Sequence, residues 1–333
     1  MKKGINLKKS NLLVLFLLMC FVGFSQPITV STTTYTPEQL VKEVLIKTPC
    51  AQITNVQWIT GSSFPTGDKS NGIGYFQNSN PAFDMADGIV LSTGKAINTA
   101  GPRGLNGGSS DGTQNDWPDD VELTTYMHNV LGNTDDYHNA TILEFDFMPF
   151  TSGMSFNFIF ASEEYGTYQC NYSDAFAFFL TNTVSGTTTN LALVPNTTLP
   201  ISVTTIRDAA YNNGNNGVCD DGNPASMNET YFDSYNAGST TNAINFNGQT
   251  VKMVAESTVT PFTKYHIKMV IQDRGDSGVD SAVFIEGGSF NIGNLDLGDP
   301  VLIENVEGLC VGDSYTLEAG LDPTLSTFEW YKD

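Results

Sequence analysis

The chain has 333 residues, of which 36 are acidic and 15 are basic, so its formal net charge is −21 at pH 7. A surface of this sign repels nucleic acid and anionic membranes, and we therefore expect no nucleic-acid partner. A chain of this length ordinarily forms one large domain or two of medium size. The acidic excess is explained either by a solvated surface or by divalent cations that neutralise part of it.

The first 25 residues predict a secretory signal peptide. Four lysines among the first nine residues precede an apolar run at 12–24, and Ser25 follows that run. The run is shorter than the roughly 20 residues of a membrane-spanning helix, so we predict cleavage after Ser25 and no membrane insertion of the exported chain. Cleavage removes four lysines and no acidic residue, which makes the exported chain still more acidic.

Two short helices are predicted. At the first, Thr36 can cap the helix, Pro37 occupies the first helical position and Gln39 completes a capping box. Its apolar face is predicted to comprise Leu40, Val41, Val44 and Leu45. The second helix is predicted to follow the aspartates at 119–120. Its core-facing residues are predicted to be Val121, Met127, Val130 and Leu131.

The other periodic segments alternate with period two, as strands do. The clearest carry an aromatic or leucine side chain at every second position, at 143–147, 156–160 and 176–180. Further candidates are 88–92, 191–194, 201–205, 249–255, 265–272 and 281–287. Some ten strands between turn-rich loops, without alternating helices, predict an all-β fold. We expect a jelly-roll-like two-sheet β-sandwich with one or two short helices.

The composition changes at 291–300, where the sequence NIGNLDLGDP is typical of an interdomain linker. After it, Cys310 is followed some 20 residues later by Trp330 in a predicted strand, which is similar to the first half of an Ig-like or PKD-like sandwich. We therefore expect a main domain at 26–296. Residues 297–333 are expected to hold a linker and the first strands of a small Ig-like β-sandwich, with further modules beyond Asp333.

Several ordered motifs together resemble one known family. They are FxFxFASEEY and DAFAFFL within 156–180, GIVLSTGKA at 88–96, NLALVP at 190–195, ISVTTI at 201–206 and YHIKMVIQDRGDSGVDSAVFIEGGSF at 265–290. These motifs resemble the choice-of-anchor L domain of secreted Bacteroidetes-type surface proteins. Members of that family typically precede repeated Ig-like or PKD-like modules and a sorting signal, such as the gliding-motility-associated domain of type IX secretion. The resemblance implies a secreted protein attached to the bacterial cell surface, with downstream modules of the same chain as a stalk.

Four cysteines remain after the predicted cleavage: Cys50, Cys170, Cys219 and Cys310. Export permits disulfides, and we prefer the pair of Cys170 with Cys219 because both lie in polar loop sequence. Four cysteines allow three full pairings, so the other pairings stay open at this point.

A first acidic cluster stands at the ends of two aromatic strands. Glu163 and Glu164 follow 156–160, and Asp174 precedes 176–180. If these strands are antiparallel neighbours, the three carboxylates converge at one end of the sheet. They would repel one another unless a cation lies among them, and basic residues are scarce. The sequence therefore predicts calcium as a cofactor here.

A second acidic cluster is the loop DRGDSGVD, which contains Asp273, Asp276 and Asp280. It is not an EF-hand, because Phe284 stands where the twelfth position requires a glutamate. Glycines and aspartates in a tight loop nevertheless suit a hard cation, and we predict these three as metal ligands too. The competing interpretation for both clusters is that the acidic side chains cap turns.

No catalytic constellation is evident. The three histidines, His128, His138 and His266, lack the spacing of metal ligands and have no identifiable nucleophile as a partner. A glycosidase needs two carboxylates held about 5 to 10 Å apart, a distance that Glu163 or Glu164 could satisfy with another acidic residue.

These observations predict a secreted, non-catalytic, adhesin-like binding module, stabilised by calcium, at the N-terminal end of a larger modular protein. A glycan or another cell-surface ligand is the expected partner, and Trp117 is the preferred residue for stacking on a sugar ring. The first alternative is a carbohydrate-active hydrolase that uses Glu163 or Glu164. The second is a purely structural surface-layer component.

Overall fold

The computed structural model describes seven parts of the chain. They are 26–47, 51–61, 71–103, 117–209, 219, 224–275 and 278–293. The predicted signal peptide, Cys50, Asp276 and the predicted Ig-like segment with Cys310 lie outside the described residues.

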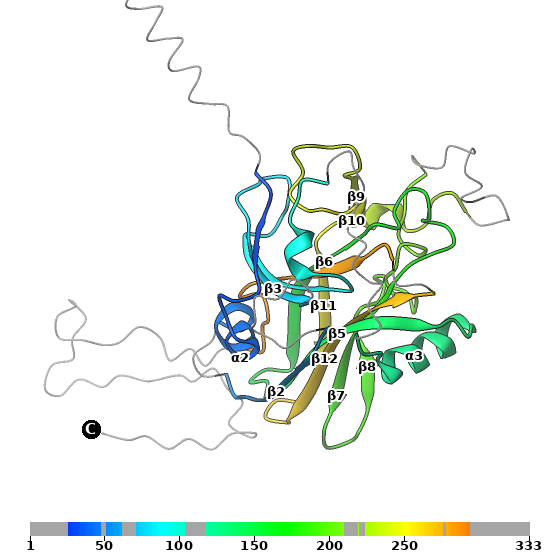
Figure 1. The fold of residues 1–333 in the computed structure, drawn as a ribbon. Helices are drawn as coiled ribbons and strands as arrows, with labels where there is room; N and C mark the ends of the chain where they lie inside the picture. The colour runs from blue at the N-terminus through cyan, green and yellow to red at the C-terminus, as the bar shows by residue number, and fades with distance from the viewer. Residues whose placement is uncertain are drawn as a thin grey trace, which may run out of the picture.

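Within the described residues, thirteen strands form two antiparallel sheets (Figure 1). The eight-stranded sheet has the order β1 (Thr29–Ser31), β3 (Ile73–Gln77), β4 (Asp87–Ser92), β13 (Ser281–Glu286), β6 (Gly153–Ser162), β10 (Gly248–Thr250) and β9 (Phe232–Tyr235), with β11 (Met253–Thr258) also paired to β6. The five-stranded sheet has the order β2 (Ile53–Ile59), β5 (Tyr137–Phe147), β12 (Tyr265–Arg274), β7 (Ala175–Asn182) and β8 (Thr188–Asn190). The predicted all-β, two-sheet architecture is confirmed.

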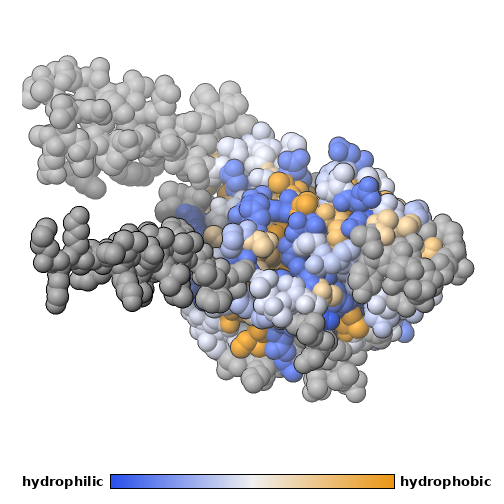
Figure 2. Space-filling model, turned by 90° about the horizontal axis from the view of Figure 1, so that it is seen from above, coloured by the Kyte–Doolittle hydropathy of each residue, from blue (hydrophilic) through white to orange (hydrophobic). Residues whose placement is uncertain are grey.

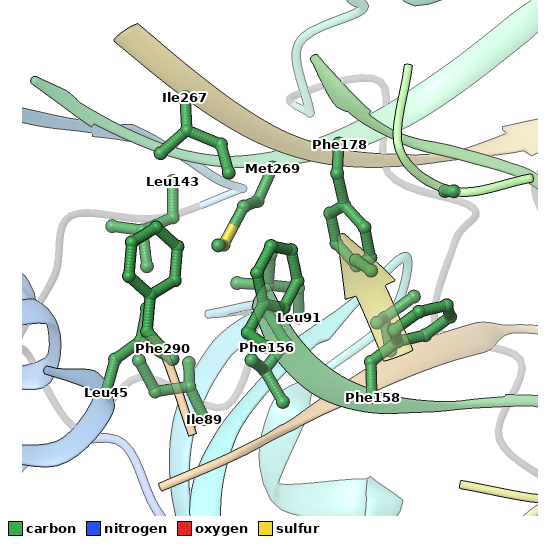
Figure 3. Packing of buried hydrophobic residues seen from close by; sticks show 14 of the residues in the cluster. Leu45, Ile89, Leu91, Leu143, Phe156, Phe158, Phe178, Ile267, Met269 and Phe290 are labelled. Carbon is green, nitrogen blue, oxygen red and sulfur yellow. The ribbon is translucent and has the colours of Figure 1, made fainter. Parts of the chain in front are cut away.

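The main core lies between the two sheets, and phenylalanines fill its centre. Phe156 and Phe158 of β6 pack edge-on against Phe178 of β7, with ring centroids 4.9 and 5.1 Å apart. Phe290, which follows β13, stacks on Phe156. Figure 3 shows these rings gathered between strands of both sheets. Burial of one such side chain stabilises the fold by about 1.5–3 kcal/mol, so this layer holds the sheets face to face.

Both sheets are also covered on their outer faces. Figure 1 shows the helix α3 (Val121–Leu131) beside strands of the five-stranded sheet. Its Leu123 and Met127 belong to one buried cluster with Ala177 of that sheet. On the outer face of the eight-stranded sheet, the rings of Phe76 and Phe284 pack edge-on at 5.4 Å within a second cluster. Strands covered on both faces bury consecutive side chains, which explains uninterrupted apolar runs such as DAFAFFL.

The first predicted helix is confirmed. The hydroxyl of Thr36 accepts a hydrogen bond from the backbone amide of Gln39 at 3.2 Å, and the Gln39 side-chain oxygen accepts one from the Thr36 amide at 2.9 Å. α2 (Pro37–Gln39) then continues as the π-helix η1 (Leu40–Leu45). All four apolar residues predicted for its face are buried and join the main core.

The second predicted helix is present as α3, but three of its four predicted core residues are wrong. Met127 is buried, whereas Val121 is 78% exposed and Val130 and Leu131 are about 40% exposed. The residues that face the sheet are Leu123 and Met127, one turn apart. Val121 stands two residues before Leu123, which is about 200° around the helix axis. Val130 and Leu131 belong to the last turn, after the packed residues end.

Two predicted strands are absent. Residues 191–194 are irregular apart from an isolated bridge between Leu193 and Pro200, and residues 201–205 form a bend and turns. Ala192, Val194, Ile201 and Val203 are nevertheless buried in the main core, and the prolines at 195 and 200 cannot donate to a strand ladder. The candidate at 249–255 is divided between β10 and β11. Two further short helices are η2 (Ala96–Thr99) and η3 (Glu229–Tyr231).

The surface mixes polar and apolar residues. Figure 2 shows one face of the molecule, on which hydrophilic and hydrophobic residues are interspersed. Large exposed apolar side chains include Val184 after β7 and Val254 in β11. In the described parts of the chain, no helix is long and apolar enough to cross a membrane.

Candidate functional site

The predicted acidic residues gather at one end of the sandwich, although not through the predicted strand pairing. β6 ends at Ser162 in the eight-stranded sheet and β7 begins at Ala175 in the five-stranded sheet, so the expectation that these strands are neighbours is wrong. Their aromatic side chains face one another across the core instead, with Phe160 stacked on Phe176 at 5.0 Å. The loop 163–174 therefore crosses from one sheet to the other.

Glu164 is the first member of the cluster and is only 5% exposed. Its Oε2 atom accepts hydrogen bonds from the hydroxyls of Ser162 and Ser281, the latter at 3.2 Å. These two serines face each other across the pairing of β6 with β13. Burial, and then the negative charge of neighbouring Asp174, raise the pKa of Glu164 well above its usual range.

Asp174 lies immediately before β7 and is 2% exposed. Its Oδ1 atom accepts a hydrogen bond from the backbone amide of Arg274 at 3.2 Å, whereas its buried Oδ2 atom has no hydrogen-bond partner. Burial is the largest cause that raises the pKa of Asp174, to about 7, and the charge of Asp280 adds to it. The nearby side chains of Ser281 and Glu164 oppose this shift.

Asp273 stands near the end of β12 and is 1% exposed. Its Oδ2 atom accepts a hydrogen bond from the side-chain amide of Asn139 at 2.8 Å, and its buried Oδ1 atom has no partner. Burial, and then the charges of Asp174 and Asp280, raise the pKa of Asp273 well above its usual range. Two of the buried aspartates thus each carry an unsatisfied oxygen atom.

Asp280 completes the buried set and is 1% exposed. Its backbone carbonyl accepts a hydrogen bond from the Glu163 amide at 3.1 Å, which joins its loop to the end of β6. A Cβ atom at Gly94 would collide with the Asp280 carboxylate, so only glycine fits at that position. Gly94 lies in the motif GIVLSTGKA, and its role at this site was not predicted.

Glu163 forms an ion pair with Arg103. Its Oε2 atom lies 3.4 Å from Nη2 of Arg103, and both side chains are buried. Arg103 also donates from Nε to Asn247 Oδ1 at 2.8 Å, and Asn247 donates to the Glu163 carbonyl at 2.5 Å. Of the first predicted cluster, Glu164 and Asp174 therefore share one electrostatic environment, whereas Glu163 belongs to an ion pair.

The four remaining carboxylates, Glu164, Asp174, Asp273 and Asp280, are called the acidic cluster below. Within the residues that the structure describes, no group of three or more His, Cys, Asp or Glu stands in an arrangement that would hold a metal ion as it is. The members are nonetheless close enough to raise one another's pKa. Asp276, the sixth predicted ligand, lies outside the described residues.

Beside the acidic cluster lies a small pocket of about 170 Å³. Glu164, Tyr168, Tyr172, Arg274, Gly278 and Val279 line it. Tyr168 and Tyr172 are 45% and 52% exposed, and neither was predicted as a ligand-binding residue. Their only signal in the sequence is that they flank Cys170 in a polar loop.

Trp117, the predicted sugar-stacking residue, is 6% exposed and its indole contacts Gly61, where a Cβ atom would collide with the ring. It therefore presents no free ring face to a ligand. Cys170 and Cys219 are joined in a disulfide, with Cα atoms 5.3 Å apart, a separation that is ordinary for such bonds.

Comparisons with known proteins give one match. No curated protein and no solved structure matches the chain significantly. A family model described as the choice-of-anchor L domain matches residues 29–291, which include both sheets and the acidic cluster. The chain therefore belongs to the choice-of-anchor L domain family, which places it among the modules of secreted or cell-surface proteins.

Proposed function

We propose that the chain is a binding module of the bacterial cell surface, adhesin-like in role, whose binding end is held in shape by calcium. The observation that supports this proposal is the acidic cluster. Its four carboxylates are each 5% exposed or less, and they come from the ends of strands in both sheets.

Two carboxylates of the acidic cluster are only partly satisfied by hydrogen bonds within the described residues. Asp174 Oδ2 and Asp273 Oδ1 are buried without a hydrogen-bond partner. The two nearest arginines are committed elsewhere, Arg274 to Asp135 at 2.6 Å and Arg103 to Glu163. An unpaired buried charge costs several kcal/mol, so the carboxylates must either hold protons or gain a cation.

Calcium suits this set of ligands. It takes six to eight oxygen atoms at flexible geometry, so carboxylates can be completed by backbone carbonyls and water. Because the described carboxylates do not already form a coordination sphere, binding would require small movements of the loops that carry them. A bound cation would connect the loop 163–174 with the segment that joins β12 to β13. It would thereby fix the surface formed by these loops before a ligand arrives.

The test is thermal unfolding of the purified protein in EDTA and then in excess calcium, together with isothermal titration of calcium. A ligand at a hundred times its Kd stabilises the folded state by about 2.7 kcal/mol. Glu164→Gln should remove this shift. Glu163→Gln is the matched control, because it makes the same change one residue away in a side chain paired with Arg103. It should lower stability but retain the shift. Neither shift nor heat in the unaltered protein would contradict the calcium proposal.

A hydrolase is the second candidate, and one observation favours it. Glu164 lines the pocket, and burial raises its pKa well above its usual range, the direction that a general acid requires. Release of reducing sugar from glycans that is lost in folded Glu164→Gln would support this candidate. A protein that neither binds nor cleaves any glycan or cell surface would instead be a structural component of the surface layer.

A further inference from the structure

We infer that the pocket formed by Tyr168, Tyr172, Arg274 and Glu164 binds a single neutral sugar ring of a glycan. This inference rests on the proposed binding function and assigns it a place and a ligand class. The pocket volume of about 170 Å³ is smaller than the roughly 300–1,000 Å³ of sites for drug-sized molecules. It therefore suits one ring of a longer chain that continues into solvent.

The two tyrosines form the aromatic part of the pocket. Their ring centroids are 5.8 Å apart and their planes meet at 87°, so they form a corner with two walls at a right angle. Both rings are about half exposed. A sugar ring has an apolar face of C–H groups that can pack on one tyrosine while its edge contacts the other.

The loop that carries the tyrosines is held by its own contacts. The Tyr168 amide donates to the Glu164 carbonyl at 3.2 Å, and the Tyr172 amide donates to the Tyr168 carbonyl at 3.0 Å. Cys170, between the two tyrosines, is joined to Cys219. A constrained loop loses little conformational entropy when a ligand binds, so the tyrosine corner is preorganised.

The polar lining favours a neutral ligand over a charged one. Arg274 is held by two contacts to Asp135 Oδ2, from Nε at 2.7 Å and from Nη2 at 2.6 Å. Because Asp135 balances the guanidinium charge, Arg274 offers hydrogen-bond donors without a net charge that would select an anionic ligand. Arginine offers only donors, whereas a carboxyl oxygen accepts. Adjacent sugar hydroxyls both donate and accept, so they match this combination.

One wall of the pocket connects it to the acidic cluster. Val279 has φ +83°, and a β-branched residue with positive φ is a genuine conformational outlier. Such outliers persist only where the surrounding structure determines them, and they concentrate at ligand sites. The next residue is Asp280, a member of the acidic cluster. Calcium bound at the cluster would therefore order this wall, and glycan binding should weaken in EDTA.

The experiment measures binding of neutral methyl glycosides by saturation-transfer NMR, followed by titration of the best binder. The panel comprises methyl α-mannoside, methyl β-galactoside, methyl β-glucoside and methyl α-fucoside, each in calcium and in EDTA. Tyr168→Ala and Tyr172→Ala should each weaken binding by about tenfold, the loss expected for one aromatic contact. Tyr172→Phe should bind normally, because it retains the ring. Trp58→Ala is the control, since Trp58 is a 39% exposed aromatic residue on β2, outside the pocket.

The outcomes separate this inference from the calcium proposal. Binding of a neutral glycoside that both alanine variants lose supports the pocket, whether or not calcium alters thermal stability. A calcium shift without binding of any neutral glycoside overturns the sugar pocket and leaves the calcium proposal intact. Equal binding by the unaltered protein and both alanine variants also overturns the inference.

Discussion

Strand β12 carries two opposite electrostatic environments along its length. In its first half, His266 pairs in register with Asp146, and Lys268 with Glu144. Near its other end, Asp273 lies among carboxylates in the acidic cluster. Hydrogen bonding to His266 is the main cause that lowers the pKa of Glu144, whereas burial and neighbouring negative charges raise that of Asp273. Glu144 of β5 and Asp273 of β12 thus behave differently, because Glu144 lies beside His266 and Lys268 whereas Asp273 lies among other carboxylates.

The first half of β12, which contains His266 and Lys268 and is called the paired end below, also shows what its basic side chains do. Lys268 Nζ lies 2.6 Å from Asp120 Oδ2 and 3.0 Å from Glu122 Oε2. Asp120 caps α3 by accepting from the Leu123 amide at 2.8 Å, so this ion pair fastens the helix to the sheet. In this half of β12, a basic side chain therefore neutralises the acidic side chains that join the helix to the sheet. The acidic cluster, in which Asp174 and Asp273 each have a buried oxygen atom without a hydrogen-bond partner, lies at one end of the sandwich, which is why we connect it with binding.

The largest expected effect on stability is that of a substitution at Asp174, in the acidic cluster. Asp174→Asn removes a buried charge without changing size, so it should raise the stability of the metal-free protein at pH 8 by about 2 kcal/mol. In saturating calcium the same variant should be less stable than the unaltered protein, because it has lost a ligand. Denaturant unfolding in EDTA and in calcium measures the stability of the two proteins. Asp174→Asn should be the more stable protein in EDTA, and the unaltered protein should be the more stable one in calcium.

Asp146→Asn is the matched control at the paired end. It makes the same chemical change in a carboxylate that lies 2.8 Å from His266 Nδ1. This variant should lose stability in both media by a similar amount and retain the full calcium shift. If Asp174→Asn were as destabilising in EDTA as in calcium, the Asp174 carboxylate would not be an uncompensated charge in the metal-free protein.

The second prediction concerns how the stability of the metal-free protein depends on pH through Asp174. The pKa of Asp174 is about 7 in the folded protein and near 3.8 when unfolded, so the folded state binds more protons between these values. Stability of the metal-free protein should therefore fall by about 2 kcal/mol as pH rises from 4 to 7. Calcium requires deprotonated ligands, so the calcium shift should grow over the same range. Unfolding free energies from pH 4 to 8, with and without EDTA, measure both slopes. Parallel pH profiles in the two media would contradict metal binding at the cluster.

The third prediction creates an uncompensated charge at the paired end. Lys268→Met retains the apolar stem of the side chain but leaves Asp120, whose side chain is 9% exposed, without its cation. We expect a loss of about 1–2 kcal/mol, less than for a fully buried pair because Glu122 is half exposed. Lys42→Met is the control at an exposed pair with Glu38 and should cost less than about 0.5 kcal/mol. Equal losses of stability for Lys268→Met and Lys42→Met in urea unfolding would mean that Lys268 does not hold α3 to the sheet.

Much of the sandwich was predictable because its central strands alternate strongly. β5, β6 and β12 carry aromatic or aliphatic side chains at every second position, and the structure buries those positions. β2 was missed because it is an edge strand in which only Ile53 is buried, so nothing alternates. The segments 191–194 and 201–205 were mistaken for strands because core burial without a ladder produces the same apolar pattern.

The acidic cluster was only partly predictable. Its carboxylates could be identified because each stands at a strand end, but their companions come from distant segments. The Ser281 amide, for example, donates to the Thr93 hydroxyl across 188 residues of sequence. No local pattern encodes such a contact, and none distinguishes Glu163, paired with Arg103, from its neighbour Glu164.

The smallest expected effect is at His266 and has its own pH window. Hydrogen bonding to Glu144 is the main cause that raises the pKa of His266 above 6.5, so its contribution is complete below pH 6.5 and is lost as pH rises through the folded pKa. His266→Gln should cost about 0.5 kcal/mol at pH 6, a value reduced for partial exposure, and almost nothing at pH 9. Lys264, 3.8 Å from Asp146, and Lys268 remain to neutralise the carboxylates at high pH. Calcium should leave the effect of His266→Gln on stability unchanged. The pH dependence of stability that the acidic cluster causes lies instead between pH 4 and 7, and it disappears when the metal binds. A calcium-dependent effect of His266→Gln would show that the two ends of β12 are coupled and that the contrast between them is not local.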